Sequence, residues 1–289
     1  MAIPRWLRPS GVDSAIGSDL GLENRGAGKF ARARRLSTSP VAAFMTRATA
    51  TRDYRHTSRN PVSLAPDPAI TPEPVIQVYG ARCLRWRGYF SLHTWIAIKP
   101  AAARDWKIYE VTPEALLRRG CCVATPKRAP DAFWHGTKPR LLAEKRGDDV
   151  GVLIERIGKA IREYRYAGKY VMWPGPNSNT FIAHLARAVP ELELELPSIA
   201  VGKDYLGHRL IGRAPSGSGF QISLFGLLGI LVSHVEGIEF NVLGLSCGIN
   251  PFNLCVKLPL PLLGHLGVPR NIGPGAHRHA LSEATGVIE

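Results

Sequence analysis

The feature that most constrains the fold is a stretch of strict two-residue alternation from Gly88 to Lys99. Its residues divide into two sets, one for each face: Phe90, Leu92, Thr94, Ile96 and Ile98, and Tyr89, Ser91, His93, Trp95 and Ala97. Successive side chains of a strand point to opposite faces, so this stretch predicts one strand of an antiparallel sheet. Further strands are expected at residues 75–79 and 107–111.

Two amphipathic helices are expected after these strands. Apolar residues recur at spacings of three and four from Val150 to Tyr164, and Asp148 or Asp149 is suited to be the N-cap. A second helix is expected after a proline-rich turn, and Pro190 ends it. Residues 112–147 contain several prolines, which break regular structure, so they are expected to be irregular.

Composition divides the chain into three parts. Residues 1–73 are basic, rich in Ala, Arg, Ser and Pro, and lack hydrophobic periodicity, so we expect them to be disordered. Residues 74–260 are expected to form a single α+β domain, in which an antiparallel sheet packs against two helices. This domain ends in a glycine-rich extension whose short apolar runs are compatible with strands. The tail, residues 261–289, is again expected to be disordered.

The chain of 289 residues carries 37 Lys and Arg against 23 Asp and Glu, a net charge of +14. Such an excess suits nucleic acid or anionic lipid, but it is spread along the chain, which favours a solvated basic surface. Nucleic acid is therefore not the expected partner. The longest apolar run, residues 220–232, is too short to span a bilayer, so peripheral membrane association through it, as an interfacial segment, stays open.

The five cysteines indicate a reducing compartment, because their number is odd and no pair has the spacing of zinc ligands. We therefore expect a cytoplasmic protein, while the arginine- and serine-rich start leaves organellar targeting open. No metal is expected, because Glu236, Glu239 and Asn241 lack a further histidine or aspartate at ligand spacing. No cofactor is expected, because the segment Ser216–Gly219 lacks the ending of a phosphate-binding loop.

The strongest candidate for a functional site is the tetrapeptide Asn177-Ser178-Asn179-Thr180, where the proline turn meets the second helix. A helix start offers free backbone N–H groups and a partial positive charge. Ser178 is the candidate nucleophile, and the N–H groups of Asn179 and Thr180 are candidate oxyanion donors. The alternative is that these residues only cap the helix, since Asn, Ser and Thr are favoured at N-cap positions.

A serine hydroxyl needs a base, and His93 is the candidate because imidazole titrates near neutral pH. Glu110, on the neighbouring strand, is expected to orient His93, with Tyr109 as the alternative if the register differs. His93 is equally compatible with a half-buried structural histidine. Trp95, Trp173 and Asn177 are expected to line a cleft for a small-molecule or peptide substrate.

Several motifs resemble a bacterial family known only as domain of unknown function 3750. They are Phe90-Ser-Leu-His93-Thr-Trp95, Trp173-Pro-Gly-Pro-Asn-Ser-Asn-Thr-Phe181, Gly202-Lys-Asp204, Ser216-Gly-Ser-Gly219 and Glu236-Gly-Ile-Glu239. The resemblance covers most of residues 75–260. It implies no activity, because the family has none established.

A second resemblance concerns circularly permuted papain-like hydrolases of the PPPDE and lecithin-retinol acyltransferase types. In these enzymes a strand histidine precedes an Asn-Cys segment that opens the catalytic helix, and here His93 precedes Asn177-Ser178-Asn179-Thr180-Phe181. The resemblance implies a permuted papain-like (NlpC-like) core with His93 as the base and Ser178 in the place of the nucleophilic cysteine.

Because Ser178 stands where these enzymes have a cysteine, three functions stay open. A cysteine at a helix start readily becomes a thiolate, whereas a serine hydroxyl does not. The first function is a hydrolase or acyltransferase that acts on an amide or ester through Ser178. The second is a non-catalytic binding module on the same fold. The third is association of the basic surface with nucleic acid or membranes.

Overall fold

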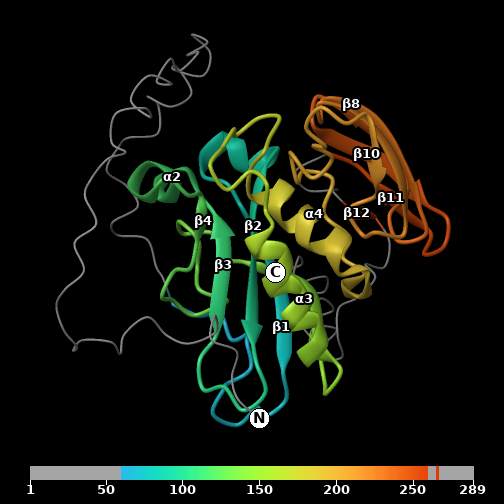
Figure 1. Ribbon diagram of the computed structural model, residues 1–289. Coiled ribbons are helices and arrows are strands. Elements are labelled where there is room, and N and C mark those ends of the chain that lie inside the picture. The colour runs from blue at the N-terminus through green and yellow to red at the C-terminus, as the bar shows by residue number, and fades with distance from the viewer. Residues whose placement is uncertain (1–59, 260–264, 267–289) are drawn as a thin grey trace, which may run out of the picture. The chain divides into compact units, whose positions relative to one another are not determined.

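The computed structural model describes residues 60–259 and 265–266, which form two antiparallel sheets and several helices (Figure 1). The first sheet has the strand order β4-β3-β2-β1-β5, and the second has the order β12-β11-β10-β9-β8-β7-β6. Helices connect strands of the first sheet, whereas the second sheet is built from consecutive strands. The predicted α+β class is therefore confirmed.

The first sheet consists of β1 (Val75–Arg82), β2 (Leu92–Lys99), β3 (Lys107–Val111), β4 (Val123–Ala124) and β5 (Arg140–Arg146). β2 is the predicted alternating strand, and it pairs antiparallel with β1 on one side and β3 on the other. It starts later than predicted, because a 3-10 helix, η3 (Arg85–Tyr89), lies in the connection between β1 and β2.

Residues 112–147 contain regular structure, so the prediction that they are irregular is wrong. In helix α2 (Pro113–Arg119), the Thr112 side chain accepts a hydrogen bond from the Ala115 backbone, and the helix ends at Gly120 with φ 69°. Proline is well tolerated at a first helical position, since its missing N–H would have no partner there. Strand β5 lies at the sheet edge beside β1, and its charged residues are typical of edge strands.

Helices α3 (Val150–Arg162) and α4 (Ser178–Ala188) lie across one face of the first sheet (Figure 1). Both predicted helices are thus present, and the short η4 (Pro190–Leu192) follows α4. Their apolar sides are buried against the sheet, and α4 contacts β2 and β3. These buried residues include Ile154, Ile157, Phe181, Ile182 and Leu185.

The opposite face of the first sheet has a different cover. Its buried cluster contains Tyr79, Trp95, Ala97 and Ile108, and Leu64 and Trp134 are among the residues that pack against it. Trp95 donates a hydrogen bond from Nε1 to the Pro130 carbonyl at 2.8 Å. Loops before β1 and before β5 therefore cover this face, and α3 and α4 cover the other.

Residues 60–73 are packed against this sheet, although composition placed them in a disordered segment. The Leu64 backbone N–H donates to Asp131 at 2.7 Å. Lys99, which is buried, donates from Nζ to the carbonyl oxygens of Thr71 and Glu73, each at 2.7 Å. The packed region therefore begins before residue 74, because buried polar groups need the carbonyl groups of this segment.

The predicted disorder of residues 1–59 lies outside the described residues. The same holds for the predicted disorder of the tail, except that residues 265–266 form strand β12 (His265–Leu266).

The glycine-rich extension forms most of the second sheet. Its strands are β6 (Ile211–Arg213), β7 (Gly219–Leu224), β8 (Leu228–Ser233), β9 (Gly237–Val242), β10 (Leu245–Asn250) and β11 (Cys255–Lys257). Neighbouring strands approach closely at glycines, and a Cβ at Gly248 would overlap the carbonyl oxygen of Ile238 on β9. In the part of the chain that the structure describes, no helix has both the length and the apolar character needed to cross a membrane.

Candidate functional site

The start of α4 is closed by a capping box. The side-chain oxygen of Asn177 accepts hydrogen bonds from the backbone N–H groups of Asn179 at 3.0 Å and Thr180 at 3.2 Å. In return, Oγ1 of Thr180 accepts a hydrogen bond from the Asn177 backbone at 3.2 Å. The two N–H groups that the sequence proposed as oxyanion donors therefore already have a partner within the protein.

The asparagine side chains also join α4 to the rest of the fold. Nδ2 of Asn177 donates to the carbonyl oxygens of Met172 at 3.0 Å and Val201 at 2.9 Å. Nδ2 of Asn179 donates to the carbonyl oxygens of Leu92 at 3.1 Å and Val201 at 2.8 Å. The helix start is thus a buried joint between β2, the loop before α4 and the loop after it.

Gly202 completes this joint from the other side. The Thr180 hydroxyl donates to the Gly202 carbonyl oxygen at 2.7 Å, so the loop lies against the helix start. Gly202 has φ +95°, and a Cβ there would lie 2.5 Å from Nδ2 of Asn177. Only glycine fits this backbone conformation and this space without strain.

Ser178 is the first residue of α4, and its side chain is almost enclosed, with 3 % of the residue exposed. Within the described residues, no hydrogen bond joins the Ser178 hydroxyl to His93 or to another base. A nucleophilic serine needs such a partner to lose its proton.

His93 and Glu110 are brought together by the pairing of β2 with β3. Trp95 pairs with Glu110, and Nε2 of His93 lies 3.3 Å from Oε2 of Glu110. Tyr109 points to the other face of β3 and pairs opposite Ile96. The His93 ring stacks on Trp134 with the ring centres 4.4 Å apart, so 5 % of His93 is exposed.

Arg128 completes a buried polar group around Glu110. Its Nη2 lies 3.1 Å from Oε2 of Glu110, and its guanidinium lies 4.7 Å from the centre of the Trp95 ring. Burial by itself would raise the pKa of Glu110, but the hydrogen bond and charge of His93, together with Arg128, lower it to about 2. The ionised carboxylate therefore fixes His93 and ties the loop that carries Arg128 to the sheet.

His93 and Ser178 lie on opposite sides of the first sheet. The Thr94 hydroxyl donates to Oδ1 of Asn179 at 2.9 Å, so Thr94 is the residue of β2 that faces the start of α4. Neighbouring residues of a strand point to opposite faces, and His93 accordingly stacks on Trp134 in the cover of the other face. The structure brings together His93 and Glu110 but not His93 and Ser178.

The two tryptophans expected in a shared cleft are also separate. Trp95 is fully buried beneath Pro130, on the face of the sheet opposite α4. Trp173 is 52 % exposed and donates from Nε1 to the Leu243 carbonyl oxygen at 2.8 Å, in the turn between β9 and β10. Asn177 is buried in the capping box, so these three residues do not line one cleft.

The sequence reasoning missed a buried charge network between the second sheet and the loop after α4. Lys203 Nζ lies 3.0 Å from Oδ1 of Asp204 and 2.6 Å from Oε2 of Glu239. Lys257 Nζ lies 2.6 Å from Oε1 of Glu239 and 2.5 Å from Glu195. Burial would raise the pKa of Glu239, but the charges of Lys203 and Lys257 lower it.

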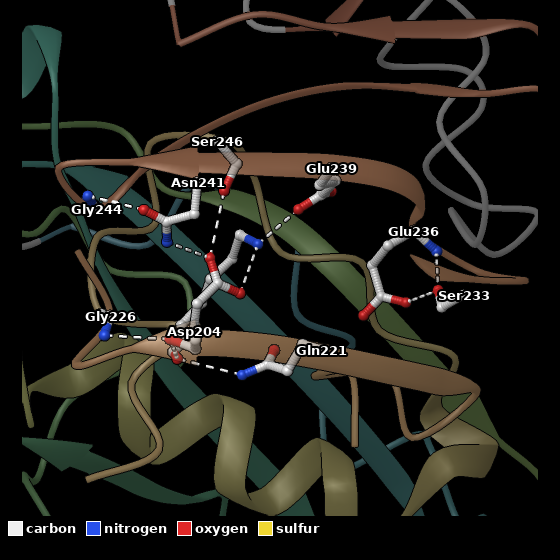
Figure 2. Close-up of polar contacts among 12 residues, drawn as sticks. Asp204, Gln221, Gly226, Ser233, Glu236, Glu239, Asn241, Gly244 and Ser246 are labelled. Atoms are coloured by element: carbon white, nitrogen blue, oxygen red, sulfur yellow. Dashed lines mark hydrogen bonds and ion pairs between the residues drawn. The ribbon is translucent and has the colours of Figure 1, made fainter. Parts of the chain in front are cut away.

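Figure 2 shows that three polar side chains of the second sheet are bonded to Asp204: Asn241, Ser246 and Gln221. Oδ2 of Asp204 accepts a hydrogen bond from Nδ2 of Asn241 at 2.7 Å, and the Asp204 carbonyl oxygen accepts one from Gln221 at 3.2 Å. Glu236, further along the sheet in Figure 2, accepts hydrogen bonds from Ser233 and Ser216. The alternation Ile-Glu-Phe-Asn-Val in β9 was the signal available in the sequence, since every second residue there is polar.

The carboxylates of this network are not arranged as the ligands of a metal ion. Among residues 60–259 and 265–266, no group of three or more His, Cys, Asp or Glu side chains is arranged to hold a metal ion. The carboxylates of Asp204 and Glu239 are instead paired with lysine ammonium groups. Each lysine of the network is thus paired with two carboxylates, and the network joins the second sheet to the loop after α4.

The chain was compared with models of protein families, with curated proteins and with solved structures. Neither the curated proteins nor the solved structures contain a match to this chain. The motifs at Ser216 and Glu236 lie beyond the matched region, while those that contain His93, Ser178 and Asp204 lie inside it. Residues 73–205 match the model of the family described as Protein of unknown function (DUF3750), as the motifs predicted.

Proposed function

We propose that the protein is a non-catalytic binding module, built on the permuted papain-like arrangement that the order of its motifs suggests. The contact of the histidine-bearing strand β2 with helix α4 supports this arrangement. The observation that carries the proposal is the orientation of His93, which points away from the start of α4.

The occupancy of the helix start supports the same proposal. An oxyanion hole requires N–H groups that are free to bind the developing negative charge. Those of Asn179 and Thr180 are bonded to Asn177, and breaking these bonds would uncap the helix. Asn177, Asn179 and Thr180 therefore stabilise the fold in this proposal and do not bind a substrate.

The rival proposal is a hydrolase or acyltransferase that attacks an amide or ester through Ser178. It is favoured by the position of Ser178 at the first turn of α4, where the partial positive charge of the helix favours an anion. It requires a second base on the α4 side of the sheet, or a rearrangement of β2 that turns His93 toward the helix.

Labelling by a fluorophosphonate probe tests the proposal on the full chain. We expect no labelling of the wild type beyond that of Ser178→Ala, since no base in the described part of the chain is bonded to the Ser178 hydroxyl.

The decisive contrary result is specific labelling of the wild type that is lost in both Ser178→Ala and His93→Ala. Such a result would assign catalysis to Ser178 with His93 as its base. Thermal denaturation of each variant serves as the control, because loss of labelling has no meaning if the variant does not fold.

A further inference from the structure

The second sheet has its polar side inside and its apolar side outside. In β7, β8 and β9, the nine residues that point outward are all apolar and all exposed. They pair across the strands, with Phe220 opposite Val232 and Ile230 opposite Phe240, so they form one continuous surface. We call this surface, made by the outward residues of β7, β8 and β9, the outer face.

The residues on the inner side of the same strands explain why the apolar side faces outward. The residues that alternate with the outer face include Gln221, Ser223 and Asn241, which are buried and bonded to Asp204. A slip of one residue would bury the apolar side, but it would expel these groups and remove the partners that Lys203 and Asp204 have on the sheet. The polar network therefore fixes the apolar side outward.

The size of the outer face is unusual for a protein surface. Phe220 is 73 % exposed and Phe240 is 52 % exposed. Nine large side chains at such exposures, with the turns beside them, present apolar area on the order of 1,000 Å². The largest apolar patch of a typical monomer is roughly 300–600 Å² and is often a binding site. A surface of this size indicates a partner.

The turns beside the outer face continue its apolar character. Phe225 lies in the turn between β7 and β8, and Leu243 lies in the turn between β9 and β10; both are exposed. Trp173, which is also exposed, is bonded to the Leu243 carbonyl oxygen. Interfaces between proteins have a polar rim, whereas exposed aromatic residues at the border of an apolar surface are typical of contact with the membrane interface.

The charge of this region favours a negatively charged partner. Between residues 206 and 259 the only acidic residues are Glu236 and Glu239, and both are buried. Arg209 and Arg213, in contrast, are exposed beside or within β6. A second copy of this chain, with the same net charge of +14, would be repelled, while an anionic surface would be attracted.

We propose that the outer face docks onto membranes that contain anionic phospholipids. The inference rests on the proposed function, because it names the partner of the binding module. The apolar side chains enter the boundary between headgroups and acyl chains, and Arg209 and Arg213 contact lipid phosphates at its border. The association is peripheral, because strands of six residues are shorter than the roughly nine to eleven that cross a bilayer.

Flotation of the full-length protein with vesicles tests this proposal. We expect the wild type to float with phosphatidylcholine vesicles that contain phosphatidylglycerol, and to bind pure phosphatidylcholine vesicles more weakly. The double variant F220T/F240T, which keeps residues suited to strands, should lose affinity by about tenfold or more.

The matched control is L117Q/V152Q, which removes two exposed apolar side chains from α2 and α3, away from the outer face. It should bind as the wild type does, and circular dichroism checks that both variants are folded. Binding that F220T/F240T retains in full, or no binding to either vesicle, would overturn the proposal.

A wild-type dimer in analytical ultracentrifugation that F220T/F240T dissociates, without vesicle binding, would assign the outer face to a second copy and overturn the proposal too. The proposed function fails separately, through labelling of Ser178 by the fluorophosphonate probe. Vesicle binding and labelling report on different residues, so the failure of one is distinguishable from the failure of the other.

Discussion

The hydroxyl of Thr94 donates a hydrogen bond of 2.9 Å to Oδ1 of Asn179 and so joins the central strand of the first sheet to the start of α4. This bond decides which residue of β2 faces the helix. It is Thr94, and the next residue toward the start of the strand, His93, points the other way. A threonine hydroxyl is no general base at neutral pH, so the contact between strand and helix is structural.

The joint at the helix start predicts a large effect of Asn177→Ala on stability. The substitution removes the helix cap and the two hydrogen bonds from Nδ2 to the Met172 and Val201 carbonyl oxygens. We expect the free energy of unfolding, from urea denaturation, to fall by about 2–4 kcal/mol. Asn177→Ser keeps a capping oxygen and should lose less. A fall below about 0.5 kcal/mol for Asn177→Ala would show that the cap is dispensable.

The sequence predicted the strands and helices that surround this joint, because β2 alternates and α3 and α4 carry apolar stripes. It also placed His93 and Trp95 on one face of β2. It could not show which face α4 covers, because all eight residues of β2 are buried and neither face is marked as the solvent side. The sequence therefore could not show on which side of the sheet His93 lies relative to Ser178, and the catalytic roles assigned to these two residues stay predictions.

The outward orientation of the apolar side of the second sheet could not be predicted from the sequence, for a related reason. Alternation of polar and apolar residues usually marks an apolar side that faces the core. Here the loop after α4 presents Lys203 and Asp204 to the sheet, and these charges require polar partners. The orientation therefore depends on residues outside the strands, which the periodicity within a strand does not report.

The group around Glu110 predicts a dependence of stability on pH. Burial opposes ionisation of Glu110, but His93 and Arg128 lower its pKa from 4.5 to about 2. A lowered pKa contributes stability that is present above about pH 4.5 and is lost as the pH falls toward 2. Between about pH 5 and pH 3, the wild type should lose about 2 kcal/mol of unfolding free energy that Glu110→Gln does not lose. Urea denaturation at both pH values measures this, and equal losses in the two proteins would refute it.

The buried network predicts that Glu239→Gln strongly destabilises the protein. Glu239 lies 2.6 Å from each of Lys203 and Lys257, so its neutralisation removes the carboxylate that the two buried ammonium groups share and breaks two buried ion pairs. We expect the free energy of unfolding to fall by about 3–5 kcal/mol. The matched control is Glu163→Gln, because Glu163 lies 3.9 Å from Lys159 and both side chains are exposed. That variant should stay within about 0.5 kcal/mol of the wild type, and similar losses in both variants would contradict the prediction.

Two glycine substitutions should change stability in opposite directions. Gly202 has φ +95°, and a Cβ there would overlap the Asn177 amide, so Gly202→Ala should cost about 2 kcal/mol or more. Gly151 lies in α3 with nothing within 4 Å of an added Cβ, so Gly151→Ala should stabilise the protein by up to about 1 kcal/mol.

Asn177→Ser shortens the side chain that Gly202→Ala would strike, so the double variant Asn177→Ser/Gly202→Ala should lose less stability than the sum of the two single losses. Thermal denaturation of all four variants measures this coupling. Additive losses at positions 177 and 202 would mean that the strain at Gly202 is in its backbone and not in its contact with Asn177.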